Sequence, residues 1–345
     1  MMQIVMMGTG TFAEPTFEAL IASFGRDVVG LVTQPERDAG NKRGSTRQTG
    51  KGMANIAREA GVAVAQPESI NTPEGLELLR AMKPDLLVVA AYGQILSKDV
   101  LTVPTRGTIN VHASLLPKYR GAAPVAYAIL GGESQTGVTI IKVTPGLDSG
   151  DMILQESLDI LPTDTTGSLE LRLAALGAKM AAEAVRKYAS GGSVDGVKQD
   201  PALVTKAPKI KKEFGLIDWT KHTVYIERFI LAMQPWPTAY TFLHRPGKET
   251  MRVIIISTSG GSVESGYKLF PYPPGTVRGT HTLSQDIALQ FNEPVWTALK
   301  IQAGQGSTVF VRELQPAGKK KMTAEEFLRG YPIVEGMRFG PEVLV

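Results

Sequence analysis

Short apolar stretches alternate with amphipathic stretches through the first half of the chain. In some of these stretches, such as residues 3–7 and 85–91, nearly every side chain is hydrophobic, as in parallel strands that are covered on both faces. In the amphipathic stretches apolar residues recur every three or four positions, which predicts helices. The expected strands cover residues 3–7, 28–33, 62–65, 85–91, 108–111, 137–143 and 152–158, and the expected helices cover residues 14–24, 53–60, 73–82, 122–130 and 168–189. This alternation predicts an α/β domain that is doubly wound about a parallel sheet.

The pattern changes after residue 193. A Gly-Gly-Ser sequence ends there, and a basic segment that contains proline follows, which favours a linker over residues 194–213. Beyond it, a helical pattern lies within residues 219–233, and short β-prone runs are separated by Gly and Pro turns. These runs cover residues 240–243, 251–257, 287–291, 295–301 and 308–314. Residues 1–193 are expected to form the α/β domain, and residues 214–345 a small barrel of the oligonucleotide-binding (OB) kind.

The amino-acid composition excludes several classes of site. The 345-residue chain has no cysteine, which excludes disulfides, a thiolate nucleophile and cysteine-ligated metal centres. It has four histidines, no two of them with the spacing of metal ligands, so no metal site is expected. No apolar run approaches the roughly 18–20 residues of a membrane span, and no signal sequence precedes the first expected strand. We therefore expect a cytoplasmic protein that does not bind membranes.

Positive charge is concentrated in the second half of the chain. Residues 1–193 contain 18 Lys and Arg against 19 Asp and Glu, whereas residues 194–345 contain 19 against 14. Clustered lysines suit a polyanionic partner such as RNA, although a solvated lysine surface is the commoner meaning of such a cluster. The clustered residues are Lys206, Lys209, Lys211 and Lys212, with a second group at Lys319, Lys320 and Lys321.

A long polar loop is expected over residues 34–52, after the second strand. A loop of this length inside a compact domain is usually functional or disordered, and both interpretations remain open. Its basic residues would lie beside the carboxyl edge of the sheet, where open α/β sheets bind their ligands. The candidates for contact with RNA in this loop are Lys42, Arg43 and Arg47.

Candidate catalytic residues lie in the stretch 107–124. A strand has a side-chain period of two, so Asn110 and His112 should project from the same face, roughly 6–7 Å apart along the chain. Pro117 cannot continue a sheet ladder, so the strand should end before it. An amide and an imidazole at a strand end can polarise a substrate and transfer protons. The alternative is that Asn110 caps a turn and His112 is a satisfied core histidine.

The turn after the first strand offers a different class of function. Gly8-Thr-Gly10-Thr-Phe-Ala13 fits the loose Gly-x-Gly-x-x-Gly/Ala pattern of dinucleotide-binding domains. A nicotinamide site would also need an acidic residue at the end of the second strand, and that strand instead runs into Thr33, Gln34 and Pro35. The two glycines are better explained by a tight strand-to-helix turn.

Two further loops should approach the same edge of the sheet. Residues 90–96 leave the fourth strand through Gly93, with exposed backbone groups beside apolar side chains, an arrangement that can hold a flat heterocycle. Residues 144–151 form a Gly-rich loop that contains Asp148. An aspartate there most often caps a turn, but it could instead pair with the imidazole of His112.

These motifs together resemble the 10-formyltetrahydrofolate-dependent formyltransferases. The resemblance rests on Asn110-x-His112-x-Ser114-Leu-Leu-Pro117, on the following Tyr-Arg-Gly-Ala-Ala-Pro, and on Gly146-Leu-Asp148-Ser-Gly-Asp. It implies direct formyl transfer, with no metal and no covalent enzyme intermediate. By similarity, Asn110 donates a hydrogen bond to the formyl oxygen, His112 assists proton transfer and Asp148 supports His112. The resemblance also implies that 10-formyltetrahydrofolate is held by Tyr92, Gly93, Gln94, Ile95 and Leu96 and by Ser114, Leu115, Leu116 and Pro117.

Later segments resemble the C-terminal domain of those family members that formylate methionine on initiator tRNA. They are Ile217-Asp-Trp219, Gln234-Pro-Trp-Pro237 and the stretch 314–320. The implied partner is initiator Met-tRNA, and the protein is expected to act as a monomer. Trp219 and Trp236 could stack on bases, but core packing is the better interpretation. The chain departs from the family in the 34–52 loop, where an Arg-Pro-x-Gly-Arg-Gly type of run is replaced by Arg-Asp-Ala-Gly-Asn-Lys-Arg-Gly.

The sequence leaves two other functions open. A formyltransferase that acts on an amino sugar nucleotide would share the three catalytic residues but would not need a basic barrel. A non-catalytic RNA-binding protein would need only the basic surface.

Overall fold

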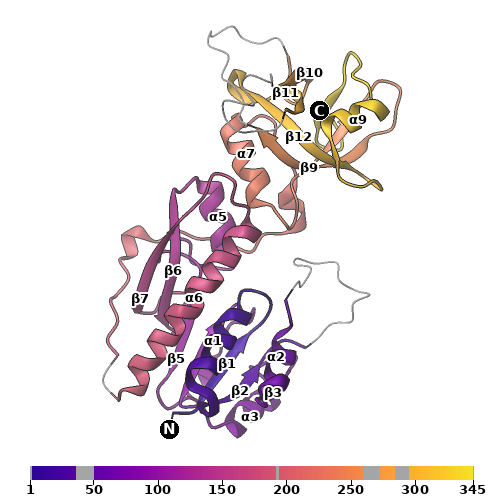
Figure 1. Ribbon diagram of the computed structural model, residues 1–345. Coiled ribbons are helices and arrows are strands. Elements are labelled where there is room, and N and C mark those ends of the chain that lie inside the picture. Colours follow the sequence, from indigo (N-terminus) through magenta and orange to yellow (C-terminus); the bar gives the residue numbers. More distant parts are fainter. Residues whose placement is uncertain (1, 36–49, 192–193, 260–271, 284–294, 345) are drawn as a thin grey trace. The chain divides into compact units, whose positions relative to one another are not determined.

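The computed structural model describes residues 2–35, 50–191, 194–259, 272–283 and 295–344. The chain divides into two compact units, Met1–Ile210 and Lys211–Val345. Each unit contains a seven-stranded sheet (Figure 1).

The sheet of the first unit has the strand order β3-β2-β1-β4-β5-β6-β7. Its strands are β1 (Ile4–Gly8), β2 (Val28–Val32), β3 (Ala63–Ala65), β4 (Leu86–Ala90), β5 (Thr108–His112), β6 (Gln135–Lys142) and β7 (Met152–Asp159). The first five strands of this order run parallel, whereas β6 and β7 are each antiparallel to their neighbours. The predicted doubly wound α/β fold is confirmed, with two antiparallel strands added at one edge of the parallel sheet.

Helices cover both faces of this sheet. They are α1 (Glu14–Phe24), α2 (Met53–Glu59), α3 (Pro73–Ala81), α4 (Lys98–Leu101), α5 (Pro124–Gly131) and α6 (Thr166–Ala189), with the 3₁₀ helices η1 (Gly25–Asp27) and η3 (Pro201–Leu203). Leu79 of α3 and Val100 of α4 belong to one buried cluster with Val89 of β4. On the opposite face, Gly177 of α6 approaches Val111 of β5 so closely that an added Cβ would lie 2.8 Å from its side chain. Burial on both faces explains why the residues of β1 and β4 are apolar almost throughout.

Residues 194–210 pack on the first unit. Val197 exchanges two backbone hydrogen bonds with Met152, each 2.8 Å long, and the Arg120 backbone pairs with Lys206 in a parallel bridge. Buried Ala207 and Ile210 add apolar contacts. The sequence placed these residues in a linker because they are basic and contain proline, but their backbone pairs with the α/β unit.

The second unit is an antiparallel sheet that closes on itself. Its strand order is β10-β11-β12-β9-β8-β14, and β13 pairs with β12. The strands are β8 (Tyr240–His244), β9 (Met251–Ser259), β10 (Val277–Thr282), β11 (Thr297–Gln302), β12 (Thr308–Pro316), β13 (Met322–Thr323) and β14 (Arg338–Gly340), and the helices are α7 (Thr223–Ala232), α9 (Ala324–Gly330), η4 (Lys212–Gly215) and η5 (Gly304–Gly306). Between the outer strands, Val277 N donates to Met337 O (3.0 Å) and Phe339 N donates to Gly275 O (2.8 Å). These bonds join the two edges of the sheet, as a small barrel requires.

Trp219 lies in the core of this second unit, as expected. Its side chain is buried, its ring stacks on Phe339 with centroids 6.0 Å apart, and its Nε1 donates to Thr241 Oγ1 (3.0 Å). The indole is therefore not available to stack on a base.

Several elements have little signal in the hydrophobic pattern. Helix α4 has only four residues, and strand β10 has a single buried residue, Val277. Helix α9 and strand β14 are also short, with seven and three residues. The expected strand at 287–291 lies outside the described residues.

Candidate active site

Asn110 and His112 lie on one face of β5, at the carboxyl end of the strand. Val111 between them faces α6, so their side chains face the opposite side of the sheet. Asn110 is half-buried and His112 is 5% exposed. Their predicted shared face is therefore present, and the accessible amide is the group that a substrate can meet.

Both ring nitrogens of His112 face an acceptor. Nε2 lies 3.0 Å from the carbonyl oxygen of Tyr119, and Nδ1 lies 3.7 Å from Oδ2 of Asp148. A carbonyl oxygen can only accept, so Nε2 carries a proton and Nδ1 is the free nitrogen of the neutral ring. The distance to Asp148 is too long for a direct hydrogen bond but short enough for charge attraction. The Asp148 carboxylate is therefore the charged group that faces Nδ1 of the ring.

Tyr119, whose carbonyl holds the imidazole, is itself fixed on both sides. Its N–H donates to Thr205 Oγ1 (2.8 Å), and its hydroxyl donates to Glu133 Oε1 (2.8 Å). Burial, together with the neighbouring Glu133, raises the pKa of the Tyr119 phenol, so the hydroxyl stays protonated as a donor. The Tyr119 hydroxyl in turn lowers the pKa of Glu133. The carbonyl that sets the His112 tautomer is thus anchored to two other elements.

The loop that contains Asp148 does not start at the carboxyl edge of the sheet, where it was expected. Strand β6 is antiparallel to β5, with Lys142 opposite Ile109, so the loop after β6 starts beside the amino end of β5. Asp148 adopts φ = 45°, in the left-handed region, and its Oδ2 accepts a hydrogen bond from Gly121 N (2.9 Å). The carboxylate therefore caps a turn, which was the alternative interpretation of this residue. It also lies beside the imidazole of His112.

The turn from Ser114 to Pro117 is tightly bonded to the sheet. Ser114 is fully buried and its hydroxyl donates to Lys118 O (2.7 Å). Leu116 N donates to Thr139 Oγ1 (3.1 Å), its carbonyl accepts from Gln155 Nε2 (2.9 Å), and the Leu116–Pro117 peptide is cis. Leu115 is half-buried. The structure thus presents a rigid backbone turn directly after the two candidate catalytic residues.

The loop after β4 leaves the same edge of the sheet, because β4 and β5 are parallel neighbours with Val89 opposite Asn110. Tyr92 and Leu96 point into the buried core, and burial raises the pKa of Tyr92 to about 12. Gln94 holds the loop by accepting from Ile70 N (3.0 Å) and donating to Glu68 O (2.9 Å). Gly93 has φ = 83°, and Ile95 is 77% exposed. The Ile95 side chain and the loop backbone are therefore the groups that a ligand can reach.

The glycine turn after β1 serves packing. An added Cβ at Gly8 would lie 2.7 Å from the Ala13 side chain and 2.9 Å from the Ala90 carbonyl, and Gly10 has φ = 77°. Close approach and a left-handed turn account for both glycines. The structure supports this interpretation over a dinucleotide site.

The basic candidates fall into two groups. Lys206, Lys209, Lys211 and Lys212 are all exposed; the first two belong to the first unit and the last two to the second. Lys42, Arg43 and Arg47 lie outside the described residues.

Sequence reasoning missed the two residues that hold the Asp148 loop. Arg120 donates from Nε and Nη2 to Gln199 Oε1, at 3.0 and 2.7 Å. Gln199 Nε2 donates to the carbonyls of Asp148 and Gly150, both at 2.8 Å. A buried glutamine has no sequence signature, because its partners come from distant segments.

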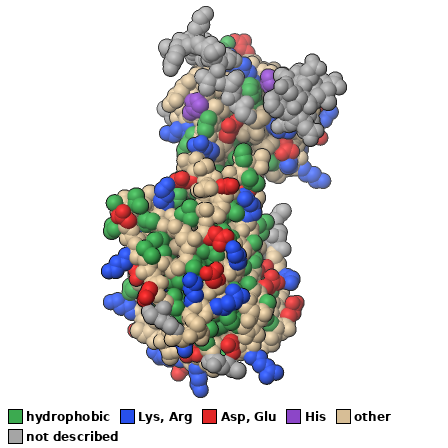
Figure 2. Space-filling view, turned by 60° about the vertical axis from the view of Figure 1, so that its left-hand side comes forward, with side chains coloured by type: hydrophobic (Ala, Val, Ile, Leu, Met, Phe, Trp, Pro, Cys, Tyr) green, Lys and Arg blue, Asp and Glu red, His purple; other side chains and the backbone are tan. Residues whose placement is uncertain are grey.

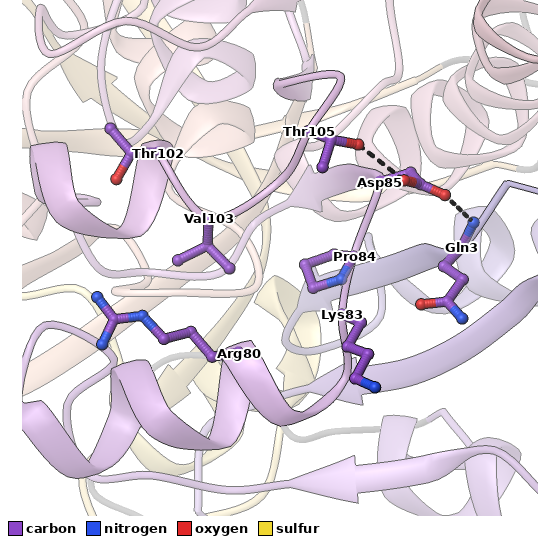
Figure 3. Close-up of a pocket in the computed structure, with 8 residues that line it drawn as sticks. All are labelled: Gln3, Arg80, Lys83, Pro84, Asp85, Thr102, Val103 and Thr105. Atoms are coloured by element: carbon purple, nitrogen blue, oxygen red, sulfur yellow. Dashed lines mark hydrogen bonds between the residues drawn. The ribbon is translucent and has the colours of Figure 1, made fainter.

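A cavity of about 560 Å³ lies elsewhere in the first unit, lined by Arg80, Lys83, Asp85 and Thr105 among others. Figure 3 shows the residues that line it. Asp85 is occupied by hydrogen bonds from Gln3 N and Thr105 Oγ1, which lower its pKa. The lining residues precede β1, β4 and β5, so this cavity lies at the amino edge of the sheet and is separate from Asn110 and His112.

Two family models match the chain. "Formyl transferase" matches residues 2–185, and "Formyl transferase, C-terminal domain" matches residues 209–332. No helix in the described part of the chain is long and apolar enough to cross a membrane.

Full-length relatives agree with these models. The methionyl-tRNA formyltransferase of Citrifermentans bemidjiense is 40% identical over 98% of this chain and 96% of its own length. That of Bacillus velezensis is 39% identical over 97% of both chains. A solved N-formyltransferase from Helicobacter canadensis, in complex with folinic acid and dTDP-3-aminofucose, has a TM-score of 0.62 at 18% identity, over 90% of this chain and 99% of its own. At that identity the structural match shows the fold alone, whereas the relatives in sequence show the family. The chain belongs to the formyl transferase family and, within it, groups with the methionyl-tRNA formyltransferases.

Proposed function

We propose that this protein transfers the formyl group of 10-formyltetrahydrofolate to the α-amino group of methionine on initiator tRNA. The observation that carries the proposal is the placement of Asn110, His112 and Asp148 at one site in a chain whose full-length relatives are methionyl-tRNA formyltransferases. The amino sugar nucleotide alternative is not favoured, because the solved sugar N-formyltransferases share only 17–18% identity with the chain. A non-catalytic role is not favoured either, because the candidate catalytic residues are present and assembled.

Asn110 is proposed to stabilise the oxyanion. When the amine nitrogen attacks the formyl carbon, the formyl oxygen gains negative charge, and a fixed amide N–H can donate to it. Asn110 has the geometry for this role, because it sits on a regular strand and its side chain is half-buried. Preorganised donors of this kind need no reorganisation during the reaction.

His112 is proposed to move the proton. A new C–N bond forms and the bond between the formyl carbon and N10 of the folate breaks. The attacking amine therefore loses a proton and the departing N10 gains one. His112 takes the proton at Nδ1, the ring atom that Tyr119 does not occupy, and Asp148 stabilises the resulting imidazolium. The ring then returns the proton to the leaving nitrogen.

The folate is proposed to lie on the carboxyl edge of the sheet. The two backbone loops, residues 92–96 and 114–117, follow neighbouring parallel strands. Both loops are held by glutamine side chains: Gln94 ties the first to Ile70 and Glu68, and Gln155 bonds the Leu116 carbonyl of the second. Fixed backbone donors and acceptors suit the edge of a pterin ring.

The tRNA is proposed to contact Lys206, Lys209, Lys211 and Lys212. All four are exposed. On the face shown in Figure 2, Lys and Arg side chains of the first unit are interspersed with Asp and Glu, so this face has no broad basic surface of its own. The four lysines, all within residues 206–212, offer a concentration of positive charge that suits phosphates.

The function can be tested by incubating the purified protein with 10-formyltetrahydrofolate and one of three acceptors: initiator Met-tRNA, elongator Met-tRNA or a dTDP-linked amino sugar. We expect formyl-methionine to form on initiator tRNA, with little product on the other two. Preferential formylation of the amino sugar would contradict the proposal, and tRNA binding without any formyl transfer would indicate the non-catalytic alternative.

The lysine cluster should make tRNA binding depend on salt. Each phosphate contact contributes about −0.7 to −0.9 to the slope of log affinity against log salt concentration. Replacing the four lysines with Gln should therefore make the slope shallower by up to about 3.6 and weaken all tRNAs alike, because phosphate contacts carry no sequence information. The readout is a binding titration across a salt series.

A charge control for this experiment is available at the amino edge of the sheet. Arg80 and Lys83 are exposed around the cavity of Figure 3, away from the catalytic residues. The Arg80→Gln/Lys83→Gln variant should keep the slope of the unmodified protein. If the cluster variant and this control change the slope equally per charge removed, the lysines act only through net charge.

A further inference from the structure

The buried amide of Gln199 links three segments that are distant in sequence. Its residue is 9% exposed, and all four hydrogen-bonding positions of the amide are used. Oε1 accepts twice from the Arg120 guanidinium, and Nε2 donates to the carbonyls of Asp148 and Gly150. The reverse orientation would face NH₂ toward a guanidinium and oxygen toward two carbonyls, so only one orientation of the amide is satisfied.

The loop that Gln199 holds has an unusual backbone conformation at Asp148 and no space for a side chain at Gly150. Asp148 has φ = 45°, which is uncommon for residues other than glycine. At Gly150 an added Cβ would lie only 1.7 Å from the Lys142 carbonyl, so this backbone runs tightly against β6. By bonding the carbonyls on both sides of Ser149, Gln199 fixes the peptide that aims the Asp148 carboxylate at His112.

The same segment also fixes the other side of the imidazole. Arg120 N donates to Thr205 O (2.9 Å), and Ala207 N donates to Arg120 O (2.7 Å). Tyr119, adjacent to Arg120, is bonded to Thr205 and supplies the carbonyl that accepts from His112. Residues 199–207 therefore support both groups that face the His112 ring.

We propose that Gln199 is a positioning residue for formyl transfer, which holds the Asp148 main chain so that its carboxylate stays beside Nδ1 of His112. The proposal rests on the proposed function. Gln199 does not touch the reacting atoms, and its effect passes through Asp148. A small displacement of a catalytic group can cost roughly 10²-fold in rate, so losing this support should slow turnover without weakening substrate binding.

Two substitutions test this role. Gln199→Leu has similar size but no polar atoms, and Gln199→Glu keeps an acceptor for Arg120 while removing both donors to the Asp148 loop. We expect kcat to fall roughly 10- to 100-fold in both variants, with KM for Met-tRNA and for the folate changed less than about threefold. Gln135→Leu is the matched control, because that glutamine bonds the exposed Asp159 at the far edge of the sheet; its kcat should be unchanged.

A double-mutant cycle separates positioning from general loss of structure. In an Asp148→Asn background, Gln199→Leu should cost little more, because the charge it positions has already been removed. A purely structural residue would cost the same factor in both backgrounds.

Each result of these experiments either supports or overturns the proposed positioning role of Gln199. A folded Gln199→Leu with kcat within about threefold of the unmodified protein would overturn it, and so would a full additional loss on top of Asp148→Asn. Loss of the cooperative thermal transition in both Gln199 variants would also overturn it, because Gln199 would then be needed for folding itself. Failure of the unmodified protein to formylate Met-tRNA would instead refute the proposed function, so the two failures are distinguishable.

Discussion

Replacing Asn110 with Ala is expected to lower kcat for formyl transfer by roughly 10²- to 10³-fold, while folate binding stays nearly intact. One preorganised oxyanion donor is typically worth this much, because it acts where charge develops and contributes little to the ground state. Asn110 is half-buried on a regular strand, so the truncation should leave the sheet in place. The measurements are steady-state formylation of Met-tRNA and equilibrium binding of the folate.

Thr108→Val is a matched control for this experiment. Thr108 lies two residues away on the same face of β5, is 5% exposed, and its hydroxyl has no hydrogen-bond partner among the described residues. Valine has the same shape and removes only that hydroxyl, so kcat should be unchanged. Asn110→Asp keeps the shape of Asn110 but replaces the donor with an anion, and we expect it to be as inactive as Asn110→Ala. If Asn110→Ala raised KM alone, with kcat unchanged, the amide would bind substrate rather than stabilise the oxyanion.

The architecture of the first unit follows from the sequence because buried parallel strands carry a strong signal. The runs that became β1 and β4 are apolar nearly throughout, and the period of two within β5 placed Asn110 and His112 on one face. The direction of β6 could not be predicted in this way. A helical run separates β5 from β6, as in a parallel crossover, but α5 has only eight residues and β6 returns antiparallel to β5.

Several contacts around His112 could not be predicted from the sequence. The Gly-rich loop left two roles open for Asp148, and only the family resemblance favoured pairing with His112, since the loop starts beside the amino end of β5 and no strand periodicity connects it to His112. The Tyr119 carbonyl sets the tautomer through a backbone atom, which any residue type would supply. Gln199 matters only because residues 119–121, 148–150 and 199–207 meet in space, and such contacts leave no local pattern.

Trp219 illustrates the opposite case, in which burial decides between two uses of the same residue. An indole in a basic C-terminal domain can stack on a base or fill a core. Trp219 is 3% exposed and its N–H is already bonded to Thr241. Contacts with tRNA are therefore better sought among the exposed lysines than at this aromatic residue.

Asp148→Asn is expected to slow formyl transfer by roughly 10²- to 10⁴-fold with little change in thermal stability. In the proposed mechanism His112 takes up a proton at Nδ1, and the negative charge of Asp148, 3.7 Å away, stabilises the imidazolium that forms. Asparagine adopts positive φ more readily than most residues, and its side-chain oxygen can still accept from Gly121 N. The loop should therefore keep its shape while the charge is lost.

The appropriate control is Asp159→Asn, an exposed carboxylate at the end of β7 that is bonded to Gln135. It removes the same charge from the same unit and should leave kcat unchanged. The decisive comparison is between the thermal unfolding midpoint and kcat of the two variants. A large drop in the midpoint of Asp148→Asn, with full activity in the fraction that remains folded, would show that the carboxylate acts only as a turn cap. A slow but normally stable variant would show that its negative charge is what the imidazolium requires.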